Sequence, residues 1–154
     1  VKSKENFRLD AAHYDILTLN SASIPGLDFI STGGSLDRIA KTKTIADYDP
    51  AYKYLNVCVT AVENDSTCFK CVRTMLTLDA LGKLDKFSAV FDVQYYMNHR
   101  KKYIERMYAD GKFGNDESLL LLFPLFKSEL TIRVKISAII HKVQNAVRCR
   151  IFKR

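Results

Sequence analysis

The sequence contains no long hydrophobic run, and this absence bears on membrane insertion. The longest apolar stretch, residues 119–126, is interrupted by Pro124. It is far shorter than the roughly 20 residues that a membrane-spanning helix needs. The chain opens with Val-Lys-Ser-Lys-Glu, which does not resemble a signal peptide. These features predict a soluble protein without a transmembrane segment.

Cysteine is also scarce, with four residues in a chain of 154. Four cysteines in a chain of this length are too few for a disulfide scaffold. Three of them lie close together in the sequence, which favours a reduced setting. We therefore expect a cytoplasmic protein. Internal repeats and low-complexity tracts are missing as well.

The composition is that of a globular domain with a positive charge. Apolar residues make up 47% of the chain and charged residues 27%, enough for a hydrophobic core. The 24 Lys and Arg outnumber the 17 Asp and Glu, which gives a net charge of +7. Such an excess favours polyanionic partners, but it does not choose among nucleic acid, nucleotide phosphates and an anionic membrane. The oligomeric state stays open.

The cysteine cluster is the most informative motif. Cys68 and Cys71 form a C-x-x-C pair, and Cys58 stands shortly before them. Soft sulfur ligands at this spacing suit zinc. A structural zinc site needs a fourth ligand, for which Asp65 is the best candidate. Two alternatives are that the cysteines are small buried hydrophobic residues, or that the C-x-x-C is a redox pair.

The first ninety residues alternate between strand and helix patterns. We predict a turn at Pro25-Gly26, a strand over 27–31, a helix over 36–47 and a second strand over 54–60. The next helix begins near Cys68, with Ser66 or Thr67 as its cap, and ends at Gly82. This order predicts an α/β fold.

The rest of the chain is predicted to be helical. Asp92 can cap a long helix that Asp110-Gly111 ends, and a short helix over 115–123 precedes Pro124. An apolar stripe continues from Leu125 to the C-terminus. We accordingly predict two parts, an α/β domain over 1–92 that carries the cysteine cluster and a helical extension with a basic tail over 93–154.

A glycine-containing loop between the first predicted strand and helix can hold an anion. Gly33 and Gly34 would present backbone N–H groups to a phosphate, and Arg38 and Lys41 follow directly. The loop lacks the G-K-[ST] ending of a Walker loop. Alternatively, the two glycines form an ordinary turn, and Arg38 and Lys41 belong to a solvated basic face of the helix.

The C-terminal forty residues are basic, with eight Lys or Arg against three acidic residues. A basic amphipathic helix can lie on anionic lipid or on nucleic acid, although its apolar stripe can also pack on its own domain. The histidines at 13, 99 and 141 are scattered, and no hydrolytic triad is visible. The sequence assigns no catalytic residue.

Read in order, these motifs resemble a known family over roughly residues 24–92. The chain is similar to the C-terminal half of uncharacterised bacterial proteins related to the PP-loop ATP pyrophosphatases of the 7-cyano-7-deazaguanine synthase and asparagine synthetase type. Aligned on its glycines, the 31–37 loop departs from the S-G-G-x-D-S motif of those enzymes, because Leu36 stands in place of its Asp and Asp37 in place of its Ser. The matching segments are Ile30-Ser-Thr-Gly-Gly34, Arg38-x-x-Lys41-Thr42, Val57-Cys58, Cys68-x-x-Cys71-x-Arg73-Thr74-Met75 and Leu81-Gly82.

The resemblance implies a structural zinc ion. In the deazaguanine synthases a strand-end cysteine and a C-x-x-C-x-x-C turn hold zinc. By position, Cys58, Cys68 and Cys71 match three of those ligands, and Asp65 stands where another cysteine is expected. Zinc would then close the loop before the helix that starts near Cys68.

The resemblance also implies an ATP-dependent enzyme that adenylates a carboxylate or similar oxygen and releases pyrophosphate. Nothing in this chain matches the adenylating loop, so we expect either the C-terminal portion of such an enzyme or a degenerate relative. Its partner would be a nucleotide or another anionic small molecule, bound near Arg38 and Lys41. A non-enzymatic zinc-bearing module that binds RNA or another polyanion is the alternative, and a metal-free interaction domain is a third.

Overall fold

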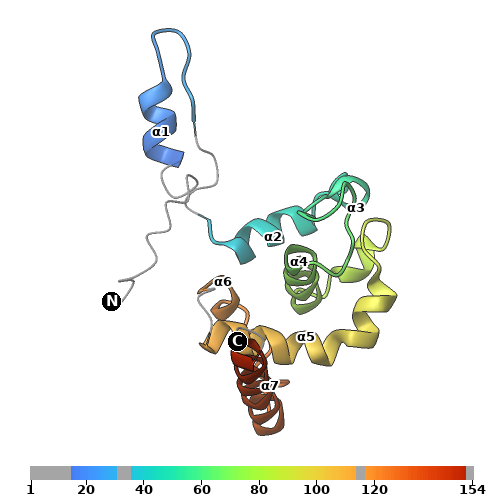
Figure 1. Cartoon of the computed structure of the whole chain (residues 1–154). Coiled ribbons are helices and arrows are strands. Elements are labelled where there is room, and N and C mark those ends of the chain that lie inside the picture. Colours follow the sequence, from blue (N-terminus) through green and yellow to red (C-terminus); the bar gives the residue numbers. More distant parts are fainter. Residues whose placement is uncertain (1–14, 31–35, 114–116, 152–154) are drawn as a thin grey trace. The chain divides into compact units, whose positions relative to one another are not determined.

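The structure is a computed structural model that describes residues 15–30, 36–113 and 117–151 (Figure 1). Its described part is rich in helix, as the sequence predicts, and contains no strand within those ranges. The β pairing found there is a single bridge between Ile24 and Leu27. The elements in chain order are α1 (Asp15–Ala22), α2 (Arg38–Ala46), α3 (Ala51–Tyr54), α4 (Phe69–Ala80), the 3-10 helix η2 (Leu84–Phe87), α5 (Val93–Phe113), α6 (Glu117–Leu120) and α7 (Ile132–Ile151).

The strand predicted over 54–60 is wrong. Tyr54 ends α3, and residues 55–60 have irregular backbone. The side chain of Asn64 makes the backbone contacts that a neighbouring strand would otherwise make. Its amide donates to the carbonyl of Leu55 at 2.7 Å, and its side-chain oxygen accepts from the N–H of Val57 at 2.9 Å. Local side-chain bonds of this kind compete with sheet pairing.

The strand predicted over 27–31 is likewise missing from its described residues, 27–30, apart from the bridge to Leu27. The turn before it is present, and Gly26 adopts a positive φ of 86° there. The sheet of the α/β prediction thus has no counterpart in the part of the chain that the structure describes.

Contacts divide the chain into two compact units, residues 1–37 and 38–154. The first contains α1 and the Pro25-Gly26 turn, where the N–H of Phe29 donates to the hydroxyl of Ser23 at 3.0 Å. The second contains every other described helix. The boundary that we predict at 92/93 lies inside this second unit, where α5 packs against α4.

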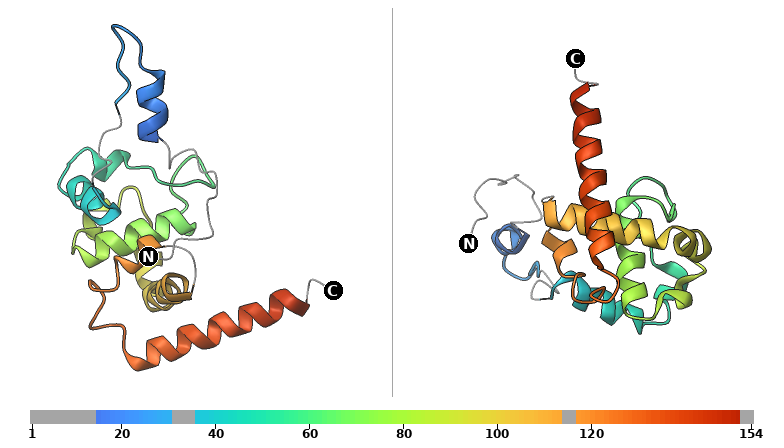
Figure 2. Two further views of the ribbon diagram at one scale, coloured as in Figure 1. Left: turned by 90° about the vertical axis from the view of Figure 1, so that its left-hand side faces the viewer. Right: turned by 90° about the horizontal axis from the view of Figure 1, so that it is seen from below.

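Helix α4 lies at the centre of the second unit (Figure 1). It packs against α2 and α5, and α5 in turn contacts α6 and α7. Both views in Figure 2 show α7 as a straight helix whose C-terminal half extends beyond α5. The largest fully buried side chains of this unit are Tyr96, Phe87, Phe126, Met75, Leu76, Leu78 and Leu122.

The ends of α4 follow the prediction at one terminus only. Gly82 ends the helix with a φ of 65°, as predicted. At the start, the N-cap residue is Cys68 and not Ser66 or Thr67. The sulfur of Cys68 accepts from the N–H of Cys71 at 3.4 Å.

Helix α5 begins as predicted but ends later. The carboxylate of Asp92 accepts from the N–H of Tyr95 at 2.8 Å, which confirms the predicted cap. The helix continues past Gly111 to Phe113. A Cβ at Gly111 would lie 2.9 Å from the ring of Phe123. This glycine therefore permits close packing and does not stop the helix.

Candidate metal centre

Four side chains with metal-binding chemistry meet where the loop after α3 joins α4. Their ligand atoms all lie within 4.8 Å of one another. Cys58 and Asp65 belong to the loop, Cys68 is the N-cap of α4, and Cys71 lies in its first turn. The structure thus brings together all four residues that the sequence singles out as ligands.

Two asparagines shape the loop that carries Cys58 and Asp65. The amide of Asn56 donates to the carbonyl of Val62. Asn64 holds the backbone of residues 55 and 57. Its side-chain oxygen also accepts a hydrogen bond from the thiol of Cys71 at 3.7 Å. The loop is therefore fixed by side-chain bonds on both sides of Cys58.

Asp65 closes the turn that leads into α4. One of its carboxylate oxygens accepts from the N–H groups of Thr67 and Cys68 at 2.9 and 2.8 Å. The other accepts from the hydroxyl of Thr60. A carboxylate has about four acceptor positions. Both oxygens of Asp65 therefore accept hydrogen bonds within the turn that carries the cysteines.

Ser66 connects this turn to α5. It has a positive φ of 57°, which is uncommon for a residue other than glycine. Its buried hydroxyl accepts from the N–H of Asp92 at 2.8 Å. The turn is therefore anchored to the residue that caps α5.

The three cysteines differ in their surroundings. Cys71 is fully buried, whereas Cys58 and Cys68 are half-buried. The contact with the Thr60 hydroxyl at 3.2 Å is the main cause that lowers the pKa of Cys58 to about 6. Burial raises the pKa of Cys71 well above its ordinary value. Cys71 accordingly becomes a thiolate only when a positive charge is placed beside it.

Asp65 is the acidic partner of this set. The Thr60 hydroxyl and the N–H groups of Cys68 and Thr67 hold the pKa of its carboxyl well below the ordinary value. The carboxylate is thus ionised over the whole physiological range and is ready to bind a cation.

The sulfur geometry fits a zinc ion. Two sulfur atoms bound at about 2.3 Å to one tetrahedral zinc lie about 3.8 Å apart. The sulfur atoms of Cys58 and Cys68 are 3.8 Å apart. This separation is nearly twice the roughly 2.05 Å of a disulfide bond, and all three cysteines are free thiols. The donor set of three sulfurs and one carboxylate suits zinc better than magnesium or calcium.

A polar cavity of about 750 Å³ opens beside the carboxylate side of the cluster. Asp65 and Ser66 line it together with the segment that leads into α5. Cys71, the fully buried donor, does not line this cavity.

The predicted anion-binding residues are not part of this centre. Gly33 and Gly34 lie outside the residues that the structure describes. Arg38 and Lys41 are exposed and lie about one turn apart at the start of α2. Anion binding by this pair stays a prediction.

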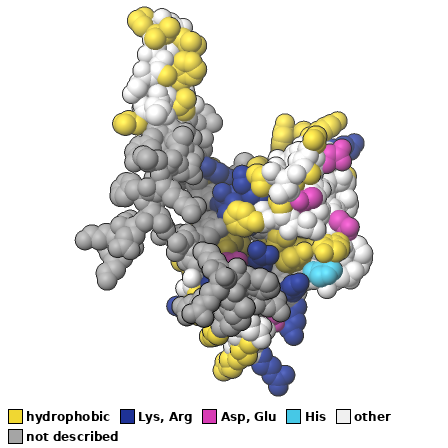
Figure 3. Space-filling model, in the orientation of Figure 1, with side chains coloured by type: hydrophobic (Ala, Val, Ile, Leu, Met, Phe, Trp, Pro, Cys, Tyr) yellow, Lys and Arg dark blue, Asp and Glu magenta, His cyan; other side chains and the backbone are white. Residues whose placement is uncertain are grey.

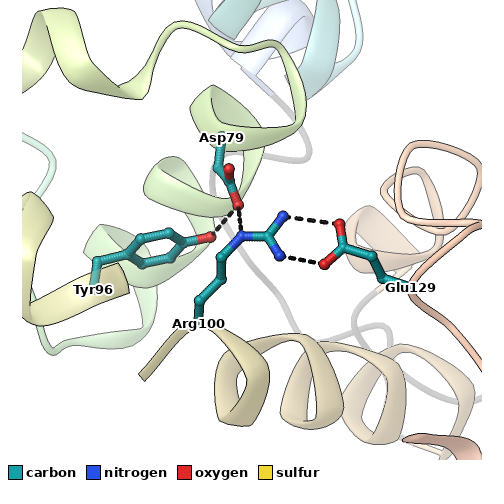
Figure 4. Close-up of polar contacts among 4 residues, drawn as sticks. All are labelled: Asp79, Tyr96, Arg100 and Glu129. Atoms are coloured by element: carbon teal, nitrogen blue, oxygen red, sulfur yellow. Dashed lines mark hydrogen bonds and ion pairs between the residues drawn. The ribbon is translucent and has the colours of Figure 1, made fainter. Parts of the chain in front are cut away.

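Sequence reasoning missed a charged network at the other end of α4 (Figure 4). Arg100 of α5 donates through Nε to Asp79 at 2.7 Å and through Nη2 to Glu129 at 2.8 Å. Its other terminal nitrogen donates to the second carboxylate oxygen of Glu129, and the hydroxyl of Tyr96 donates to Asp79 at 2.8 Å. Single charged residues so far apart in the sequence carry no local signal of this pairing.

Comparisons with family models, with curated proteins and with solved structures found no match for this chain. None of the helices in the described ranges has both the length and the apolar character needed to cross a membrane.

Proposed function

We propose that the cysteine cluster is a structural zinc site that joins the loop over residues 55–68 to the start of α4. The observation that carries this proposal is the convergence of Cys58, Asp65, Cys68 and Cys71 within 4.8 Å. The separation of two of the sulfur atoms, which matches tetrahedral zinc, supports it.

The position of the cluster supports a structural role. Helix α4 contacts α2, α5 and η2, so its first turn influences most of the unit. The loop before it has no sheet pairing, and side-chain hydrogen bonds hold it while Leu55 and Val57 pack against the core. A bound zinc ion supplies positive charge that stabilises thiolates in this partly buried place. Cys68 and Cys71 then hold the helix terminus, and Cys58 and Asp65 hold the loop.

Metal analysis of the purified protein tests this proposal. We expect about one zinc per chain in protein prepared without added metal, and loss of most of that zinc in Cys68→Ser. Cys149→Ser is the matched control, because Cys149 lies near the end of α7 and outside the cluster; it should keep its zinc. Well-folded wild-type protein without metal would refute the proposal.

The family resemblance supports a second proposal, that the protein acts in an ATP-dependent adenylation reaction. The exposed pair Arg38 and Lys41 on α2 is the described feature that favours an anion there. Calorimetric titration of the intact gene product with ATP should show binding that weakens in Arg38→Ala combined with Lys41→Ala. Retention of RNA at low salt with no affinity for ATP would favour the polyanion-binding alternative.

A further inference from the structure

Helix α7 is apolar on two opposite faces. On one face Val134 and Ala138 are 8% and 1% exposed, and α7 packs there against α5. The opposite face is open to solvent between Ile132 and Val143, with exposed fractions from 43% to 75%. Its members, which we call the outer stripe, are Ile132, Ile136, Ile139, Ile140 and Val143.

The outer stripe has the spacing of a continuous helical face. Ile132, Ile136, Ile139 and Val143 follow one another at intervals of four, three and four residues. Such residues lie one above another on a helix. Five large aliphatic side chains on one helix face are more than the scattered exposed apolar residues of an ordinary surface.

Positive charge borders this stripe on both sides. Arg133 and Lys135 are exposed and lie at its two edges. Helix α7 carries five Lys or Arg and no acidic residue. Further along, Lys142 is already 3.7 Å from Asp110 of α5. Where α7 lies in Figure 3, dark-blue basic side chains stand next to yellow hydrophobic ones.

A cavity beside the stripe adds two more lysines. It has a volume of about 440 Å³ and lies between α5, the segment around α6 and the start of α7. Lys112, Lys127 and Lys135 line it over an apolar floor that includes Phe123 and Leu130. Lys135 is three residues after Ile132 and four before Ile139. It therefore joins the cavity to the outer stripe.

Three kinds of occupant can be compared on this surface. A second copy of α7 would bring together like charges at both edges of the stripe. A nucleic acid would meet the cations but leave the aliphatic side chains in water. An anionic bilayer accommodates both features, because aliphatic side chains enter the acyl region while Lys and Arg at the edges stay among the phosphates.

We propose that the outer stripe and the lysine cavity together bind the surface of a membrane that contains anionic phospholipid. Helix α7 lies in the plane of the interface with Ile132, Ile136 and Ile139 turned toward the lipid. Lys112, Lys127 and Lys135 contact the headgroup phosphates. The attachment is peripheral, since only one face of α7 enters the acyl region.

Sedimentation of the full chain with lipid vesicles tests this proposal. The probes are vesicles of phosphatidylcholine alone and of phosphatidylcholine with 30% phosphatidylserine. We expect binding to the mixed vesicles, with an affinity that falls about a hundredfold when Lys112, Lys127 and Lys135 are changed to Ala. The matched control removes the same charge from exposed positions elsewhere, with Lys70, Lys101 and Lys102 changed to Ala; it should lose at most about tenfold.

A second variant tests the apolar contribution. Ile136→Asn with Ile139→Asn should abolish vesicle binding while leaving the helical circular dichroism unchanged, because both side chains are exposed in the free protein. If this variant fails to fold, the lysine variant still decides. Equal binding to both vesicle types, failure to bind either, tighter binding to RNA through the same lysines, or a dimer that the stripe variant dissociates would each overturn the proposal.

Discussion

The two ends of helix α4 are held in different ways. At the C-terminal end, Asp79 meets Arg100, which also binds Glu129 (Figure 4). At the N-terminal end, three thiols and a carboxylate converge. At the C-terminal end, the chain provides both the positive and the negative groups. At the N-terminal end, it provides only groups that can bind a cation. One end is complete as a protein structure, and the other has the composition of an ion site.

Because the two ends of α4 are held differently, their contributions to stability should respond differently to metal and to pH. The Arg100 network needs no added component, so its contribution is independent of metal. The cysteine cluster contributes fully only with its thiols ionised around a cation, so its contribution depends on metal and on pH. Variants at the two ends of the same helix can therefore separate the two modes of stabilisation.

The largest effect is expected from Cys71→Ser, which changes the buried member of the cluster. Loss of a structural metal ranks among the few causes of very large destabilisation, and we expect a decrease of about 4 kcal/mol or more in the free energy of unfolding. Urea denaturation in zinc-containing buffer measures it. Cys149→Ser should change little, and equal stability of both variants would show that the cluster adds no metal-dependent stability.

Arg100→Ala should have a smaller effect at the other end. It removes charged hydrogen bonds to Asp79 and Glu129, and the half-buried carboxylate of Asp79 loses its cation. We expect a loss of about 2 kcal/mol, the same with and without a chelator. Arg106→Ala, on α5 like Arg100, breaks only an exposed pair with Asp110 and should cost about 0.5 kcal/mol or less. A loss that depends on chelator would contradict the separation of the two ends.

Asp65→Asn sharpens the assignment of the fourth ligand. The amide oxygen can still accept from the N–H groups of Thr67 and Cys68, but the negative charge is gone. Zinc affinity, measured by competition with a chelating dye, should fall about tenfold. Asp47→Asn is the control, since Asp47 pairs with Lys83 at the surface. Unchanged zinc affinity in Asp65→Asn would exclude the carboxylate as a ligand.

The smallest effect is a difference in thiol reactivity in metal-free protein. At pH 7 Cys58, with its pKa near 6, is mostly thiolate, whereas burial keeps Cys71 protonated. Iodoacetamide should therefore modify Cys58 first, and the rate at Cys58 should fall as the pH drops through 6. Peptide mass spectrometry follows both sites, and zinc should protect them. Faster alkylation of Cys71 would show that the turn opens without metal.

The comparison also shows which features the sequence reveals. The cysteine cluster lies within one short segment, so spacing alone brings its members together. Arg100 binds both Asp79 and Glu129, so this network joins residues from three separate segments, and no local sequence pattern predicts it. Short-range chemistry is thus visible in the sequence, while long-range pairing depends on how the helices pack.

Two predictions failed because of a side chain outside the predicted segment, one close to it in the sequence and one distant. The β-branched residues over 54–60 suggested a strand, but the side chain of Asn64 binds that backbone instead. Gly111 suggested a helix end, but its missing Cβ admits the ring of Phe123. In both cases the deciding partner is a single side chain that β propensity or a glycine signal does not take into account.

X-ray absorption at the zinc edge measures which atoms bind the metal. For protein purified with its own metal, we predict a four-coordinate zinc with three sulfur ligands at about 2.3 Å and one oxygen at about 2.0 Å. Asp65→Asn should change the oxygen shell alone. A spectrum with fewer than three sulfur ligands, or wild-type protein that folds without any bound metal, would contradict it.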